Sequence, residues 1–83
     1  MKTSRYFKFT RVRTDRIGIK DEWIVRTITS PIMRQVQSDG RVRLWSKISE
    51  ANGKYLRVIL LEDGETVHNA FFDRSFRERE GVA

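Results

Sequence analysis

The sequence predicts an α+β domain in which an N-terminal segment and a helix pack on a four-stranded antiparallel meander sheet. Asp39-Gly40, Asn52-Gly53 and Asp63-Gly64 each lie between β-rich runs, and such dipeptides are the strongest short-range signal for a hairpin. A segment with helix signals at both of its ends precedes these runs. The apolar residues of the runs also fall on a single face once the turns are set, as a sheet with one buried face requires.

The predicted strands are the runs IMRQVQ (32–37), RVRLWSKIS (41–49), KYLRVILLE (54–62) and ETVHNAFF (65–72). We assume three-residue turns that end at Gly40 and Gly53, and a two-residue turn at Asp63-Gly64. Residue 36 then opposes 42, 48 opposes 56, and 60 opposes 67. One face collects the apolar side chains and a single polar one: Val36, Val42, Leu44, Ile48, Leu56, Val58, Leu60, Val67, Asn69 and Phe71.

The opposite face of the predicted sheet mixes cations, aromatic rings and the only histidine. It comprises Gln35, Arg43, Trp45, Lys47, Tyr55, Arg57, Ile59, Leu61, His68, Ala70 and Phe72. The assumed register puts Trp45, Ile59 and His68 in one cross-strand row and Lys47 opposite Arg57. Because this face is too apolar to stand fully in water, we expect a cover. The segment around Tyr6, Phe7 and Phe9, a second copy of the chain, or a partner would each serve.

The helix is predicted within KDEWIVRTITSP (20–31). Asp21 is expected as the N-cap, with Glu22 in the first turn and Pro31 ending the element. The residues at helical spacing on one side are Trp23, Ile24, Thr27 and Ile28. A strand is the alternative, because several of these residues are β-branched, but both ends carry helix signals.

The segment RYFKFTRVRTDR (5–16) fits either type of element. Phe7 and Phe9 alternate as in a strand, whereas Phe9, Val12 and Arg16 follow helical spacing.

The chain of 83 residues is expected to form one domain. Its parts are a basic N-terminal segment (1–18), the helix plus meander (19–73) and a charged C-terminal tail (74–83). The net charge is +6, and residues 1–43 hold 11 Lys and Arg against 4 Asp and Glu, a net of +7, whereas the rest holds 6 against 7. A basic half favours a polyanionic partner, either nucleic acid or an acidic protein.

Composition excludes several kinds of site. Without cysteine there is no disulfide framework, thiol nucleophile or zinc finger, and one histidine does not support a histidine-based metal site. No Walker loop, dinucleotide fingerprint or nucleophile elbow is present, so no cofactor is expected. No apolar run is long enough for a signal peptide or a membrane span, so a cytoplasmic location without membrane contact is expected by default.

The predicted catalytic residues are Arg43, Lys47, Arg57 and His68. Cleaving RNA without a metal requires a base for the 2′-hydroxyl, cations for the phosphorane and an acid for the leaving oxygen. His68 titrates near neutral pH, and arginine and lysine bind phosphate. The alternative is a solvated cationic sheet face with ordinary cross-strand pairs, in which His68 has no carboxylate beside it.

Six further residues are candidates for nucleic-acid binding. Trp45 or Tyr55 would stack a base. Arg11, Arg13 and Arg16 would act as an arm on a phosphate backbone, or else lie in a solvated terminal segment. Arg74 would reach the cationic face, although a structural salt bridge of Asp73 and Arg74 at the strand end is favoured for this pair. The remaining alternating charges of the tail are expected to be solvated.

With this order of elements, the chain resembles the RelE and BrnT toxin superfamily, which has the barnase–EndoU–colicin–RelE type of fold. The stretches that carry the resemblance are DEWIVRTITSP, DGRVRLW, YLRVILLEDG and TVHNAFFDR. More narrowly, residues 19–77 are similar to small uncharacterised bacterial proteins with the same frame.

The resemblance implies an RNA-directed toxin, a metal-independent endoribonuclease that acts on RNA or the ribosome and is held by a cognate antitoxin. By strand position it carries over Arg43, Lys47, Arg57 and His68, with Arg74 after the last strand. The terminal catalytic tyrosine or histidine of the superfamily has no clear match after Phe72. A degenerate relative, or a non-catalytic basic module that binds nucleic acid or an acidic protein, is therefore the alternative, and a homodimer is the third.

Overall fold

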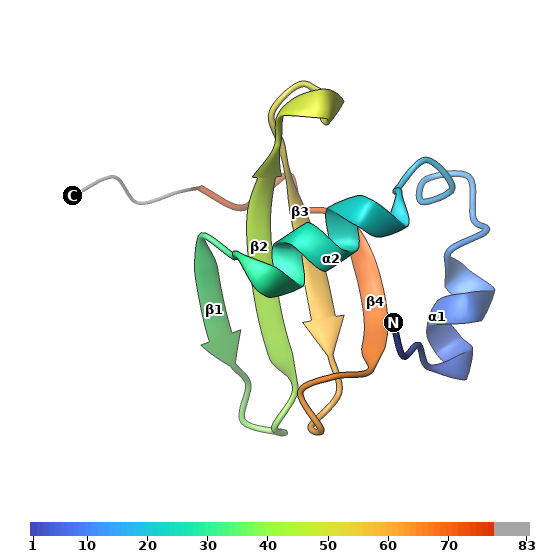
Figure 1. Cartoon of the computed structure of the whole chain (residues 1–83), viewed down its shortest axis with the longest axis vertical. Helices are drawn as coiled ribbons and strands as arrows, with labels where there is room; N and C mark the ends of the chain where they lie inside the picture. Colours follow the sequence, from blue (N-terminus) through green and yellow to red (C-terminus); the bar gives the residue numbers. More distant parts are fainter. Residues whose placement is uncertain (78–83) are drawn as a thin grey trace.

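A computed structural model of the chain describes residues 1–77 (Figure 1). Its elements in order are α1 (Arg5–Thr10), α2 (Asp21–Thr29), β1 (Met33–Val36), β2 (Val42–Ile48), the 3₁₀ turn η1 (Ser49–Ala51), β3 (Lys54–Leu60) and β4 (Val67–Phe72). The strands form one antiparallel sheet in the order β1-β2-β3-β4. The predicted α+β fold is confirmed: α2 crosses one face of the sheet, and α1 lies beside β4.

Helix α2 starts one residue before the predicted position. Lys20 has extended backbone and is the N-cap, without a side-chain capping bond, so Asp21 is the first helical residue and not the cap. The Asp21 carboxylate instead pairs with Arg11. Helix α2 ends at Thr29, with Ser30 as C-cap ahead of Pro31. The predicted inner side is confirmed, because Trp23, Ile24 and Thr27 are buried.

The ambiguous segment 5–16 begins with a short helix. The Ser4 hydroxyl caps α1 by accepting a hydrogen bond from the Phe7 amide at 3.1 Å. Phe7 is 2% exposed and Phe9 78% exposed, which a strand with both rings on one side would not give. Before α1, the Ser4 amide donates to the Val67 carbonyl at 2.9 Å and the Val67 amide to the Lys2 carbonyl at 2.8 Å. The N-terminus therefore pairs with the edge of β4.

The first hairpin matches its prediction, and the second is shifted. Gly40 has a φ of 90°, and Val36 opposes Val42 as expected. Between β2 and β3, however, Ile48 opposes Lys54 and not Leu56, so that part of the predicted register is wrong. The turn is longer than assumed, because η1 precedes the left-handed residues Asn52 and Gly53. A shift by two residues keeps every side chain on its predicted face.

A β-bulge changes the last strand. Leu60 opposes Val67 as predicted, but Ile59 opposes Asn69, so His68 is the extra residue of the bulge. Beyond it, Ala70 and Phe72 turn toward the core, and Asn69 and Phe71 turn away. The predictions that Asn69 and Phe71 face the core, and that His68 shares a row with Ile59 and Trp45, are wrong because a bulge of one residue reverses the alternation.

The core lies between α2 and the sheet and is extended by Phe7 of α1. Its buried members are Phe7, Ile19, Trp23, Ile24, Val42, Leu44, Ile48, Leu56, Val58, Leu60, Val67 and Ala70. Helix α2 packs over β2 and β3, which leaves Val36 of the edge strand β1 at 56% exposure. The opposite face of the sheet is not covered by α2, and the candidate site lies on that face.

Candidate functional site

Arg57 lies at the centre of the sheet face opposite α2. The corrected register pairs Arg57 with Trp45 on one side and Phe71 on the other. The Arg57 guanidinium carbon lies 5.3 Å from each of these ring centroids. Two cation–π contacts and a neighbouring carboxylate, that of Asp73, thus hold the guanidinium in place.

Asp73 follows β4 and joins Arg57 to Trp45. Asp73 Oδ2 accepts a hydrogen bond from Trp45 Nε1 at 3.0 Å and lies 3.4 Å from Arg57 Nη1. Burial alone would raise the pKa of Asp73, but hydrogen bonds from Ser75 and Trp45, together with the charge of Arg57, outweigh it and lower the pKa below 3.8. The carboxylate is therefore charged at neutral pH.

A hollow of about 400 Å³ lies next to Arg57 on this face. We call it the arginine hollow, lined by Tyr6, Gln37, Arg41, Arg43, Arg57, Ile59, His68 and Asn69. Arg43 opposes Ile59 across β2 and β3, and its Nη1 is 3.4 Å from Gln35 Oε1. Three guanidinium groups around one concavity favour an anionic ligand such as phosphate.

His68 enters the arginine hollow because of the bulge. Its Nδ1 lies 3.1 Å from Ser4 Oγ, and its ring stacks on Tyr6 with centroids 4.8 Å apart. When Nδ1–H donates to Ser4 Oγ, the lone pair on Nε2 is left to accept a proton. Burial lowers the pKa of His68 from 6.5 and the charge of Arg41 lowers it further, against an opposing effect of Glu62. His68 is therefore mainly neutral at pH 7.

The arginine hollow brings together three of the four predicted catalytic residues, Arg43, Arg57 and His68. Lys47 lies elsewhere: it is exposed on β2 and opposes Tyr55. The prediction that Lys47 opposes Arg57 is wrong because of the two-residue shift between β2 and β3.

Sequence reasoning missed the lining residue Arg41, and it named Tyr6 only within a segment that could cover this face, not as a neighbour of His68. Arg41 lies two positions before Arg43, so strand alternation continued past the turn would have placed both on one face. No local signal predicts Tyr6, because its position depends on the N-terminal segment pairing with β4.

The basic N-terminal cluster is divided by the fold. Arg11 pairs with Asp21 and lies over the Phe7 ring, and the exposed Arg13 has its Nε 3.6 Å from Asp15. Arg16 turns inward: its Nη1 donates to Asn69 Oδ1 at 2.9 Å, and its guanidinium carbon is 5.3 Å from the Phe71 centroid. A uniform basic arm is therefore not present, since Arg16 belongs to the sheet face.

The remaining predicted binding residues lie toward the C-terminal side of this face. Phe76 stacks on Trp45 with centroids 5.0 Å apart and meets Tyr55 edge-on at the same distance. This sheet face was expected to need a cover, and Phe76 provides one over Trp45, which is 5% exposed. Stacking of a base on Trp45 stays a prediction that requires Phe76 to move. Arg74 is exposed, and the predicted salt bridge of Asp73 with Arg74 is wrong, because Asp73 pairs with Arg57. The predicted solvated tail continues into residues 78–83, outside the described residues.

Within residues 1–77, no group of three or more His, Cys, Asp or Glu side chains is placed to hold a metal ion. No helix in that same part of the chain is long and apolar enough to cross a membrane.

Comparison with protein-family models, with curated proteins and with solved structures finds no match to this chain.

Proposed function

We propose that this protein binds RNA at the arginine hollow and cleaves it without a metal, in the manner expected of a RelE-like toxin. The observation that carries the proposal is the grouping of three arginines with a neutral histidine around one concavity. Arginine holds the phosphate, and a histidine with a lowered pKa can accept a proton at pH 7. The order of a helix followed by a four-stranded meander agrees with the resemblance.

The proposed chemistry is an internal transfer within RNA. His68 Nε2 takes the proton of a 2′-hydroxyl, and the 2′-oxygen forms a bond to the adjacent phosphorus. Arg41, Arg43 and Arg57 stabilise the additional negative charge of the phosphorane. The bond from phosphorus to the 5′-oxygen then breaks, and this oxygen receives a proton from the Tyr6 hydroxyl. The products are a 2′,3′-cyclic phosphate and a 5′-hydroxyl; solvent then takes the extra proton from His68 and returns one to the Tyr6 oxygen.

The experiment is cleavage of an end-labelled RNA by the purified protein in the presence of EDTA. We expect cyclic phosphate ends, and a rate that falls on the acid side through a pKa below 6.5, since only neutral His68 is a base. His68→Gln should lower the rate by about 10²–10⁴-fold, the usual contribution of a general base. Arg34→Ala, at an exposed position outside the arginine hollow, is the matched control for Arg43→Ala. Equal activity of wild type and His68→Gln would exclude this chemistry.

The second candidate is a non-catalytic module that binds nucleic acid or an acidic protein, such as a cognate antitoxin. It is favoured by the pairing of Arg57 with Asp73, which engages one of the three cations before any ligand arrives. Such a module would slow the migration of RNA or of an acidic partner in a gel-shift assay, and the RNA recovered from the complex would be intact. Cleavage in EDTA that His68→Gln abolishes would decide against it.

A further inference from the structure

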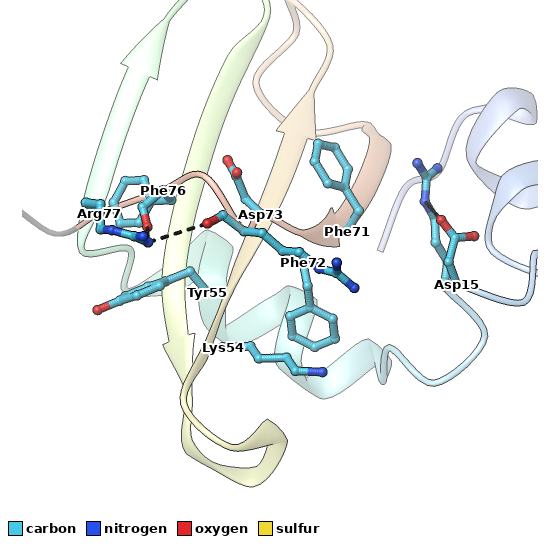
Figure 2. Close-up of a pocket in the computed structure, with 10 residues that line it drawn as sticks. Asp15, Lys54, Tyr55, Phe71, Phe72, Asp73, Phe76 and Arg77 are labelled. Carbon is cyan, nitrogen blue, oxygen red and sulfur yellow. Dashed lines mark hydrogen bonds and ion pairs between the residues drawn. The ribbon is translucent and has the colours of Figure 1, made fainter.

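A second and larger hollow lies where β3 begins and β4 ends, next to the sheet face of the arginine hollow, and its lining includes residues from both faces of the sheet. Its volume is about 790 Å³, within the range of small-ligand sites. We call it the aromatic hollow, lined by Asp15, Arg16, Lys54, Tyr55, Phe71, Phe72, Asp73, Arg74, Phe76 and Arg77. In Figure 2, Lys54 lies beside Phe72, Tyr55 lies nearer Phe76, and Asp15 lies apart from them on the far side.

The two carboxylates of the aromatic hollow are already engaged. Asp73 accepts hydrogen bonds from Trp45, from Arg57 and from both the amide and the hydroxyl of Ser75. Asp15 has its oxygens 3.6 Å from Arg13 Nε and 3.7 Å from Arg16 Nε. Neither carboxylate is therefore left to neutralise a further cation in this hollow.

Two cations at the rim of the aromatic hollow are Lys54 and Arg74. Among residues 1–77, neither forms an ion pair, and the Lys54 ammonium lies 5.6 Å from the Phe72 ring centroid. Arg77 donates to the carbonyls of Arg74 and Phe76. The net charge of the lining thus favours an anion near Lys54 and Arg74.

The walls of the aromatic hollow are rings fixed by their neighbours. Phe72 packs against Trp23 of the core, with centroids 6.3 Å apart, and Tyr55 meets the edge of Phe76. Fixed rings beside cations are the combination on which proteins stack the bases of single-stranded nucleic acid, because every base has an apolar face and a phosphate is attached.

The two hollows meet at one stack of side chains. Arg16 of the aromatic hollow and Arg57 of the arginine hollow both contact Phe71, each with its guanidinium carbon 5.3 Å from the ring centroid. A chain that has a phosphate in the arginine hollow can therefore place its next unit in the aromatic hollow by crossing Phe71.

We infer that the aromatic hollow is a nucleotide-binding site, with the base against the rings of Tyr55 and Phe76 and the phosphate at Lys54 and Arg74. A free mononucleotide is its minimal ligand. In the longer form, which rests on the proposed function, it holds the nucleotide next to the phosphate that the arginine hollow binds.

The test is an NMR titration of the full chain with adenosine 5′-monophosphate, adenosine and inorganic phosphate. We expect the mononucleotide to shift the amides of Lys54, Tyr55 and residues 72–74, adenosine to do so more weakly, and phosphate to act mainly at Arg41 and Arg43. Lys54→Ala/Arg74→Ala should weaken mononucleotide binding about tenfold, as loss of two charge-assisted contacts implies. The matched control is Lys8→Ala/Arg34→Ala, which removes the same charge at exposed positions outside both hollows.

Three outcomes would overturn the inference. The two double variants could weaken binding equally, which would indicate unspecific attraction. The mononucleotide could shift only the arginine hollow. An acidic peptide with an aromatic residue could shift the aromatic hollow while the mononucleotide does not, which would make it a peptide site. Failure of the proposed function is distinguishable, because absent RNA cleavage with mononucleotide binding retained would leave this inference standing.

Discussion

At the scale of single residues, Asp73 fixes the arrangement of the sheet face that carries the arginine hollow, and it also lines the aromatic hollow. Its carboxylate fixes the Trp45 indole and the Arg57 guanidinium and receives the hydrogen bonds of Ser75. The Asp73 side chain is 8% exposed and that of Arg57 20% exposed. Because both charges are largely removed from water, loss of one leaves the other without compensation.

Asp73→Asn should therefore destabilise the protein. The amide keeps the size of the side chain but not its charge, and we expect the free energy of unfolding to fall by about 2 kcal/mol. Urea denaturation followed by tryptophan fluorescence measures this. Glu65→Gln is the control, because Glu65 pairs with Lys2 at 3.9 Å with both side chains about two-thirds exposed, and should cost less than about 0.5 kcal/mol. Equal losses in both variants would show that the Asp73 pair contributes no more than a surface pair.

His68 links stability to pH. Its pKa is lowered in the folded chain, so between the folded value and 6.5 the unfolded chain binds more protons. The contribution of His68 is complete above pH 6.5 and is lost as pH falls. Between pH 7.5 and 5.5 the free energy of unfolding should decrease more in the wild type than in His68→Gln. Glu50 and Asp63, with pKa values lowered to about 2, titrate below this window. The same pH dependence in both proteins would contradict the direction assigned to His68.

At the scale of elements, sequence reasoning predicted what depends on neighbours along the chain. The turn at Gly40, the inner side of α2 and the pairing of Leu60 with Val67 all follow from local signals. The bulge at His68 does not, because it depends on how β4 meets both β3 and the N-terminal segment. Its consequence is large: His68 lies beside Tyr6 and Ser4, and Phe71 beside Arg57.

The docking of α2 on the sheet includes one buried polar contact. Thr27 Oγ1 donates to the Trp23 carbonyl at 2.8 Å and shares a hydrogen bond with Ser46 Oγ, and both side chains are buried. Thr27→Val and Ser46→Ala should each lower the free energy of unfolding by about 1 kcal/mol, because each leaves a buried hydroxyl or carbonyl less satisfied. The double variant should lose less than the sum.

A double-mutant cycle in urea measures the coupling between Thr27 and Ser46. Thr29→Val is the matched control, because Thr29 Oγ1 makes the same bond to its helix, to the Val25 carbonyl at 2.8 Å, at an exposed position. It should have an effect below about 0.5 kcal/mol. Strict additivity in the cycle would show that the two hydroxyls do not hold α2 to the sheet.

At the scale of the whole molecule, the fold brings together cationic side chains that lie apart in the sequence. Residues 1–43 carry a net charge of +7 and the rest of the chain −1, yet the arginine hollow combines Arg41 and Arg43 with Arg57 from the other half. Arg11 and Arg13 lie outside this hollow, where they pair with Asp21 and Asp15. Within it, Arg41 and Arg57 also have acidic partners, Asp39 and Asp73. The charge composition therefore predicts a polyanionic partner, but the sheet register is required to identify which cations such a partner would contact.

The salt dependence of RNA binding tests this distribution of charge. For single strands each neutralised phosphate contributes about 0.7 to the slope of log K against log salt, so one phosphate in the arginine hollow predicts a slope of about −0.7. A second phosphate at Lys54 and Arg74 would bring the slope to about −1.4. The double variant Arg41→Ala/Arg43→Ala should reduce the size of the slope by about 0.7, and Arg13→Ala should leave it unchanged. Fluorescence anisotropy of a labelled tetranucleotide at several salt concentrations measures it. If only Arg13→Ala changes the slope, the phosphates lie on the N-terminal segment and not on the sheet.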